Sequence, residues 1–363
     1  MQHAKLSPSS SARWLSCTGS VKAEQAFPSS TTSYAAEGTT AHALAELCLT
    51  TNDHPTKYIG QTLEGHIVDE DMAEHIAAYC AYVKSYSGVH LYEHRFSLTK
   101  WIPDSFGTSD AVVIDEANKT AHIIDLKYGK GVSVDAEQNT QAMLYALGVI
   151  DDLGFMYEFD TVVIHIYQPR IKNYSSWQTS TKYLLEWAEW VSQRAKETQL
   201  PDAPRTPSDK ACQWCKAKAT CKALLDHTHN VIMNDFDDLT SINPDTLTDN
   251  ELRVVMDNAK LIKSWLDAVE AHIFDKLNNG QAFDGYKLVE GRSTRTWQDE
   301  QQAAILLADK VPSDKLFTQK LISPAQAEKL LKNDKELFAS LVTKSAGKPT
   351  LVPSCDKRIA LND

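Results

Sequence analysis

Two acidic side chains separated by a short turn are the residues of this sequence best suited to binding a divalent cation. Asp110 lies in the segment Gly107 to Asp115, and Asp125 lies in the segment Thr120 to Lys127. If Ala117 and Asn118 form a two-residue turn, the numbers of paired residues add up to 235 and Asp110 faces Asp125. Their Cα atoms would then be roughly 4.5 to 5.5 Å apart.

The chemistry of this pair indicates a metal site. Asp125 and Lys127 are two residues apart on one strand, so their side chains leave the same face of the sheet. Two close carboxylates repel unless a cation lies between them, and hard oxygen ligands favour Mg²⁺ or Mn²⁺. Lys127 would hold an attacking water or stabilise a transition state. The alternative is a solvated hairpin, because a register shift of one residue would move Asp110 to the other face.

Two predicted helices carry polar pairs that would complete such a site. His42 and Glu46 are four residues apart and share a helix face, so that His42 would ligate a metal and Glu46 would orient it. Gln141 and Tyr145 are also four residues apart, and they would hydrogen-bond a phosphate or a base. The alternative for each pair is an ordinary half-buried helix edge.

The cysteines form a second group. Cys212, Cys215 and Cys221 lie within ten residues of one another, and cysteine-bound metal sites usually need four thiolates. Cys17 is the best fourth candidate, because Cys48 and Cys80 lie on apolar helix faces, although Cys355 stays open. On this spacing alone, Zn²⁺ and a 4Fe-4S cluster fit equally well. Closing the loop from Cys17 would tie the cofactor to the stability of the whole domain.

The elements that would position these residues alternate between helices and strands. We predict helices from Thr39, over 71–86, 137–150 and 184–198, and strands over 89–98, 108–115, 120–127 and 161–168. A short helical turn is expected over 12–17. This order predicts an α/β fold with a central mixed β-sheet flanked by helices. A mainly helical C-terminal extension follows, with a long helix over 249–277, a hairpin over 286–297 and a helix that opens at Ser323.

Composition limits the class of protein. The chain has 363 residues, of which 42% are apolar and 23% charged, as in ordinary globular proteins. A net charge of −11 argues against a nonspecific nucleic-acid coat, so any DNA contact would come from local basic patches. The candidate patches are Lys127 to Lys130, Arg170 with Lys172, and the set Arg205, Lys210, Lys216, Lys218 and Lys222. We expect a protein of the cytoplasm without membrane contact, since there is neither a long apolar run nor a signal peptide.

Taken together, these residues resemble the RecB-like branch of the PD-(D/E)XK nucleases. The resemblance is to the iron-sulfur members, which include CRISPR-adaptation exonucleases, the AddB nuclease domain and phage or prophage recombination exonucleases. It runs in order through Glu37 to His42, Gly107 to Asp110, Asp125-Leu-Lys127 and Gln141 to Tyr145, with Cys17, Cys212, Cys215 and Cys221 as a one-plus-three cluster. It covers roughly residues 1 to 225. One departure is Asp125, where many relatives carry Glu.

The resemblance implies a fold, a site and cofactors. It implies a restriction-endonuclease-like core, with His42, Asp110, Asp125 and the carbonyl of Leu126 as ligands to Mg²⁺ or Mn²⁺ and Lys127 as the catalytic lysine. It also favours a 4Fe-4S cluster over Zn²⁺ at the four cysteines. We predict a nuclease domain over residues 1–228 and a C-terminal region of unknown role over 229–363.

The function expected from these residues is metal-dependent hydrolysis of DNA. The chain would act as an exonuclease on linear single- or double-stranded ends during phage or prophage recombination or repair, alongside a single-strand annealing protein or helicase. One alternative is a catalytically silent module that binds single-stranded DNA or a recombination partner. Another is an endonuclease, although the sequence offers no base-reading motif. In the C-terminal region, Arg292, Arg295 and Trp297 are candidates for DNA contact, and residues 344–358 for partner contact.

Overall fold

The computed structural model describes residues 4–27, 33–233 and 249–286. The chain divides into two compact units, Met1–Asp275 and Lys276–Asp363. The described part of the second unit comprises only the end of helix α9 and the turn that follows it. The predicted domain boundary at residue 228 stays a prediction.

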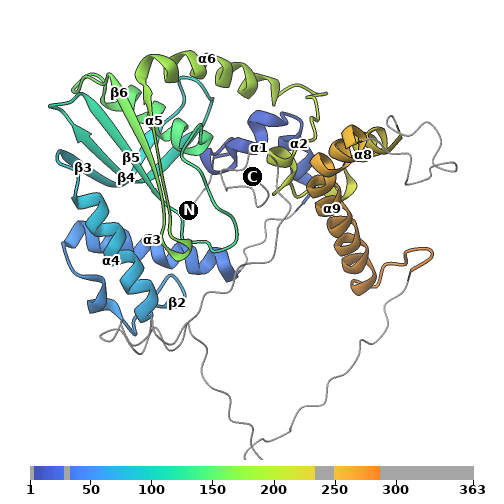
Figure 1. Cartoon of the computed structure of the whole chain (residues 1–363), viewed down its shortest axis with the longest axis horizontal. Coiled ribbons are helices and arrows are strands. Elements are labelled where there is room, and N and C mark those ends of the chain that lie inside the picture. The colour runs from blue at the N-terminus through green and yellow to red at the C-terminus, as the bar shows by residue number, and fades with distance from the viewer. Residues whose placement is uncertain (1–3, 28–32, 234–248, 287–363) are drawn as a thin grey trace, which may run out of the picture. The chain divides into compact units, whose positions relative to one another are not determined.

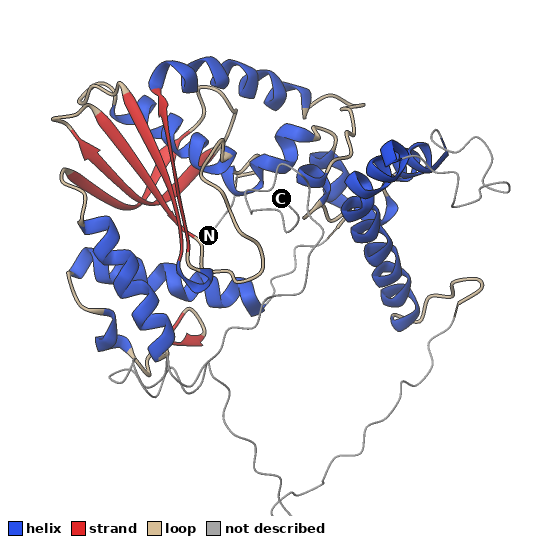
Figure 2. Ribbon diagram, in the orientation of Figure 1, coloured by secondary structure: helices blue, strands red, loops and turns tan. Residues whose placement is uncertain are grey.

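The first unit is built on a five-stranded mixed sheet (Figures 1 and 2). Its strands lie in the order β3 (Val89–Ser97), β4 (Phe106–Asp115), β5 (Thr120–Leu126), β6 (Thr161–Gln168) and β7 (Asn173–Ser180). Within this sheet β5 and β6 pair in parallel, and the other neighbours are antiparallel. A separate two-stranded hairpin consists of β1 (Thr62–Leu63) and β2 (His66–Ile67).

Helices cover both faces of this sheet. The longer ones in the first unit are α3 (Ser33–Thr51), α4 (Glu70–Lys84), α5 (Thr140–Leu153), α6 (Thr181–Glu197), α8 (Lys222–Met233) and α9 (Asp249–Asn278), the last of which ends in the second unit. The shorter ones are η1 (Pro8–Ser10), α1 (Ser11–Ser16), α2 (Ser20–Ala23), η2 (Glu24–Ala26), η3 (Pro55–Tyr58), η4 (Pro169–Ile171), α7 (Asp209–Cys212) and η5 (Lys218–Thr220).

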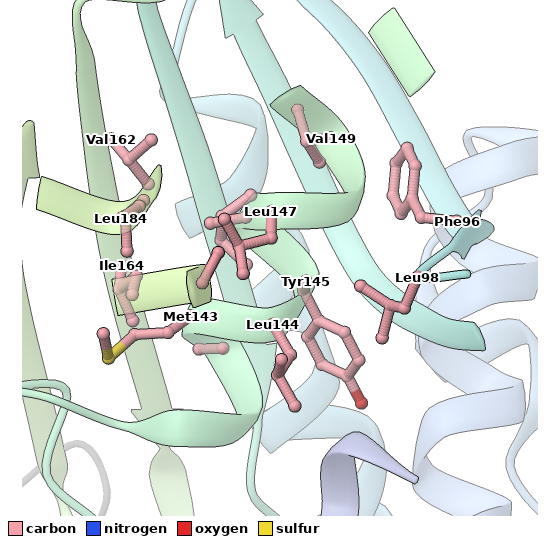
Figure 3. Close-up of a cluster of buried hydrophobic side chains, with 14 of the residues drawn as sticks. Phe96, Leu98, Met143, Leu144, Tyr145, Leu147, Val149, Val162, Ile164 and Leu184 are labelled. Carbon is pink, nitrogen blue, oxygen red and sulfur yellow. The ribbon is translucent and has the colours of Figure 1, made fainter. Parts of the chain in front are cut away.

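Side-chain alternation along the strands separates the two apolar layers. In β4, Val112 and Ile114 join the core under α5 and α6, whereas Ala111 and Val113 join the core under α3 and α4. Figure 3 shows the first of these cores, in which Leu144 and Leu147 of α5 lie among side chains of the strands and of α6. The sheet is therefore buried on both faces, and this confirms the predicted layers.

Local capping explains where several helices begin. The Asp69 carboxylate accepts a hydrogen bond from the Met72 amide at 2.7 Å, and Asn139 accepts one from the Ala142 amide at 3.2 Å. Ser180 caps α6 in the same way through the Tyr183 amide. Each cap satisfies an amide that the first helical turn leaves without a partner.

All four predicted strands and the predicted helices of the described region are present, but β7 was missed. Its sequence, Asn173 to Ser180, is almost entirely polar, so it lacks the apolar strand signal. The side chains of this edge strand alternate between half-buried and exposed positions, and they pair with β6 along its whole length. The predicted helix at Ser323 and the predicted hairpin beyond residue 286, including Arg292, Arg295 and Trp297, lie outside the described residues, as does Cys355.

No helix within the described ranges combines the length and the apolar character needed to cross a membrane.

A histidine on β6 has an acid-sensitive environment. His165 is only 3% exposed, and its Nδ1 and Nε2 atoms lie 2.9 Å from the Tyr82 hydroxyl and 3.1 Å from His122 Nδ1. Burial, and then the neighbouring His122, lower the pKa of His165 to about 4. A histidine in the unfolded chain has a pKa near 6.5. Between that pH and about 4, the unfolded chain therefore binds a proton at this residue that the folded chain does not bind.

This environment predicts a pH dependence of stability. The stabilisation from neutral His165 is fully present above about pH 6.5. It is lost as the pH falls toward about 4, and the total loss in the free energy of unfolding is about 3 kcal/mol. Chemical denaturation across this range gives the free energy of unfolding of the wild type and of His165→Gln at each pH. The contribution of His165 is the difference between the two proteins in the slope of that free energy against pH. A His66→Gln variant, on the separate hairpin, serves as the control. Equal slopes for the wild type and His165→Gln would contradict the assignment.

Candidate metal centre

The strand register places the two acidic residues as predicted. Ala111 pairs with Ile124 and Asp115 with Thr120, so the paired numbers add up to 235 along the ladder. Asp110 and Asp125 stand one step beyond the Ala111 and Ile124 pair, at the same end of β4 and β5. The connection is a turn over 116–119 in which the Lys119 amide donates to the Glu116 carbonyl. The predicted register is therefore confirmed.

Asp110 connects the sheet to helix α3. Its Oδ2 accepts a hydrogen bond of 2.7 Å from the Leu126 amide, which fixes the carboxylate against β5. Its Oδ1 lies 3.2 Å from Nδ1 of His42. His42 thus reaches the carboxylate from α3, as the sequence predicted. Glu46 is exposed one turn further along α3.

Glu93 belongs to the same cluster and was not predicted. Its Oε1 lies 3.9 Å from Nδ1 of His42, and one ligand atom each from His42, Glu93 and Asp110 lie within 4.8 Å of one another. The β3–β4 ladder pairs Tyr92 with Ala111 and His94 with Ser109 but omits Glu93, whose φ is 42°. This local left-handed conformation occurs where β3 passes Asp110, and no residue type around Glu93 indicates it.

On the other side of the site, a polar chain leads from Asp125 to helix α5. The Lys127 ammonium lies 2.8 Å from Oδ2 of Asp125 and donates a hydrogen bond of 3.0 Å to Gln141 Oε1. The Gln141 amide in turn donates to the Tyr145 hydroxyl at 2.8 Å. Gly107 leaves room for this tyrosine, because a Cβ there would lie 2.8 Å from the ring. Gln141 and Tyr145, the predicted pair on α5, therefore fix the position of Lys127 through these hydrogen bonds.

The charges of the site are strongly coupled. Burial opposes the charged form of His42, but the charge and hydrogen bond of Asp110 outweigh it and raise the pKa of His42 to about 9. Burial, followed by the charge of Asp110, raises the pKa of Glu93 to about 7. Burial also raises the pKa of Asp125, despite the charge of Lys127. The carboxylate of Asp110 is held ionised, with a lowered pKa, because His42 and Lys127 more than offset its burial.

This donor set fits a divalent cation. Asp125 is 2% exposed, and its Oδ2 has no hydrogen bond within the part of the chain that the structure describes, although Lys127 is at ion-pair distance. Glu93, Asp110 and His42 add two carboxylates and an imidazole at one spot. Clustered oxygen donors with one imidazole suit Mg²⁺ or Mn²⁺. The carbonyl of Leu126 as a ligand stays a prediction.

The four predicted cysteines gather on the side of the N-terminal arm, residues 4–27. Cys17 and Cys212 are buried in one apolar cluster with Leu224 and Leu261, and Cys221 packs against it. Cys215 follows Cys212 in a turn in which its amide donates to the Cys212 carbonyl. Cys48 and Cys80 lie instead in the core under α3 and α4, as predicted for free thiols. The fold thus brings Cys17 to the three cysteines that follow it by some 200 residues in the sequence.

The fold and this site define a mixed α/β protein with a half-buried histidine-carboxylate centre and a separate group of cysteines. The chain belongs to the family described as "Protein of unknown function (DUF2800)", whose model matches residues 3–359. A solved structure titled "Crystal structure of SSO0001" is 12% identical, with a TM-score of 0.22, over 50% of this chain and 85% of that chain. So remote a likeness carries no argument about fold or function.

The geometry predicts that Glu93 contributes to cation binding. Replacing it by Gln removes one negative charge beside Asp110 while keeping the shape of the side chain. We expect Glu93→Gln to weaken binding of Mn²⁺ at least about tenfold, a usual cost for altering the surroundings of a metal site. Titration of Mn²⁺ followed by electron paramagnetic resonance measures this. The exposed Glu116→Gln, in the hairpin turn, should bind like the wild type, and equal affinity in both variants would remove Glu93 from the site.

Proposed function

We propose that this protein is a metal-dependent deoxyribonuclease of the RecB-like PD-(D/E)XK type, acting as an exonuclease on linear DNA ends. The observation that carries the proposal is the meeting of Asp110, Asp125 and Lys127 at the end of two paired strands, with His42 beside them. This is the set of side chains that the resemblance implies. Recombination or repair of phage or prophage DNA is the setting that the resemblance favours.

The residues that would hold Mg²⁺ or Mn²⁺ are His42, Asp110 and Asp125, with Glu93 added from the geometry. When bound, such an ion supplies positive charge to a phosphate and makes a water more acidic. Asp110 is oriented for this role before any ion arrives, because the Leu126 amide and His42 already fix both of its oxygens. Pre-orientation of this kind reduces the cost of organising the site.

Lys127 acts in this proposal as a fixed positive charge. Burial disfavours its ammonium form, but Asp125 and Asp110 more than compensate and raise its pKa above the ordinary value. It is therefore protonated at neutral pH as long as these two carboxylates carry no bound cation. Its contacts with Asp125 and Gln141 leave a donor for an attacking water or a phosphate oxygen, since an ammonium has three. The lysine orients the water and offsets charge that develops on the phosphate.

A second candidate function is a binding module on the same fold that holds single-stranded DNA or a recombination partner without cleaving it. The clustered, mutually repelling carboxylates disfavour it. A surface that only binds phosphate gains nothing from Asp110 and Asp125, because their negative charges repel the ligand. An annealing protein or helicase remains the proposed partner class.

The proposal predicts that single substitutions abolish hydrolysis. Asp125→Ala and Lys127→Ala should each lower the rate of digestion of linear DNA with Mg²⁺ or Mn²⁺ at least about a hundredfold. Comparison of linear, nicked and circular DNA separates an exonuclease from an endonuclease. The control is Lys182→Ala, whose ammonium is exposed on α6. Binding without digestion by the wild type would favour the silent module, and full activity of both site variants would overturn the site.

We further propose that Cys17, Cys212, Cys215 and Cys221 hold a 4Fe-4S cluster rather than Zn²⁺. A tetrahedral zinc site with bonds of about 2.3 Å needs thiolates within about 4 Å of one another. Among the described residues, the three ligand atoms that lie within 4.8 Å of one another belong to His42, Glu93 and Asp110, so the sulfurs are spread more widely. A wider spread suits a cluster, because each cysteine binds a different iron.

Anaerobic purification tests the cofactor. The wild type should absorb near roughly 400 nm and contain iron, and Cys17→Ser should lose both together with thermal stability. Cys48→Ala is the matched control, because Cys48 is buried in the core under α3 and α4. If the purified protein contains zinc in place of iron, the proposed 4Fe-4S cluster is wrong but the four proposed cysteine ligands stand. A Cys17→Ser protein with its full metal content would remove the fourth ligand.

A further inference from the structure

A pocket of about 280 Å³ opens on the N-terminal arm, and the metal centre does not use it. Its walls come from three segments: the chain before η1, the helices α1 and α2 with the residues around them, and the loop after Cys215. Three cations line it, namely Lys5, Arg13 and Lys216. Among the described residues of its lining, Glu24 is the one acid. In a chain of net charge −11, this local excess of positive charge favours an anionic ligand.

The pocket also offers hydrogen-bond donors. Glu24 is engaged by its neighbours, since Arg13 Nε lies 2.9 Å from its Oε2 and the Lys216 amide donates to its Oε1 at 2.8 Å. These contacts fix Arg13 and offset the negative charge of Glu24. Ser20 is 2% exposed, and its hydroxyl has no hydrogen-bond partner among the residues that the structure describes. An unpartnered buried hydroxyl in a basic pocket is suited to a phosphate oxygen.

An exposed aromatic residue lies two positions before Lys216, which lines the pocket. Trp214 stands between Cys212 and Cys215 and is 70% exposed, although tryptophan is usually well buried. Its carbonyl accepts a hydrogen bond of 3.3 Å from Arg13 Nη1, and Lys216 follows two residues later. The backbone of Trp214 is therefore attached to the same arginine that lines the pocket. An exposed aromatic ring beside fixed cations is the arrangement that single-stranded nucleic acid uses, with bases stacked and phosphates paired.

The pocket is connected to the metal centre through α1. Ser10 lines the pocket, and the hydroxyl of the next residue, Ser11, lies 2.7 Å from the Thr140 hydroxyl. Thr140 immediately precedes Gln141, which holds Lys127. On the same arm, Pro8 lies against Gly107, where an added Cβ would be 2.9 Å from its ring. The N-terminal arm thus lines the pocket and also contacts residues that neighbour the centre.

We infer that this pocket and Trp214 bind one strand of the DNA substrate, with a backbone phosphate in the pocket and a base stacked on the indole. The inference rests on the proposed function, because it names the part of the chain that guides the strand toward the centre. It assigns a task to the residues around the cysteines other than holding a cofactor. An acidic peptide would use the cations but gain little from stacking, so DNA fits the combination better.

The test measures binding separately from cleavage. Fluorescein-labelled oligodeoxythymidine is titrated with the anaerobically purified full chain in Ca²⁺, and anisotropy is read at several salt concentrations. Trp214→Ala should weaken binding about tenfold, within the usual contribution of base stacking. The double variant Lys5→Gln, Lys216→Gln should reduce the salt slope by about 0.7 for each phosphate that no longer has a cation beside it. The matched control is Trp190→Ala with Lys182→Gln on α6, where both side chains are exposed.

The outcomes separate this inference from the proposed function. On an oligonucleotide without bases, Trp214→Ala should bind as the wild type does, because this strand has nothing to stack on the indole. If the wild type digests DNA and the pocket and tryptophan variants bind the strand as tightly as the wild type, the inference is overturned. The proposed nuclease function would then still stand. A wild type that neither binds nor digests DNA would overturn both. Displacement of the strand by a polyglutamate peptide, with no effect of Trp214→Ala, would point to a peptide partner and also overturn the inference.

Discussion

Repulsion between clustered acids is the constraint around which this structure is organised. Glu93, Asp110 and Asp125 meet where β3, β4 and β5 lie side by side. Three carboxylates so close together would repel one another strongly without positive charge nearby. The chain supplies that charge from two sides, with His42 on α3 and Lys127 beside α5. Each helix is in turn anchored by its own apolar core, so the two hydrophobic layers serve to bring the cations to the acids.

Part of this arrangement could be predicted because it depends on spacing within single elements. Asp110 faces Asp125 once the turn length is known, and Gln141 reaches Tyr145 because a helix repeats every 3.6 residues. Glu93 could not be found in this way. It joins the site through a left-handed backbone conformation that interrupts the β3–β4 ladder, and nothing in the order of residue types indicates that break. The polar edge strand β7 was missed because it lacks an apolar pattern.

The N-terminal arm lies between the group of cysteines and the helix α5 beside the acidic centre, although these are far apart in the sequence. Arg194 of α6 donates to the Leu15 carbonyl, and Thr206 donates its amide to the sulfur of Cys17, so the arm is bound by segments from the far end of the first unit. The same arm contacts α5 through Ser11. The arm therefore contacts the segments around the cysteines and also the helix that carries Gln141, so both sites lie next to it.

The long separation between Cys17 and its three partner residues has a consequence for synthesis on the ribosome. About 200 residues must be added after Cys17 before Cys212 exists, which takes on the order of 10 to 40 s at ordinary rates of translation. For most of that interval the side chains of Trp14 and Leu15, which are buried in the folded protein, lack their neighbours on α6, because α6 begins only at Thr181. The four cysteines can therefore meet only after most of the first unit has been synthesised.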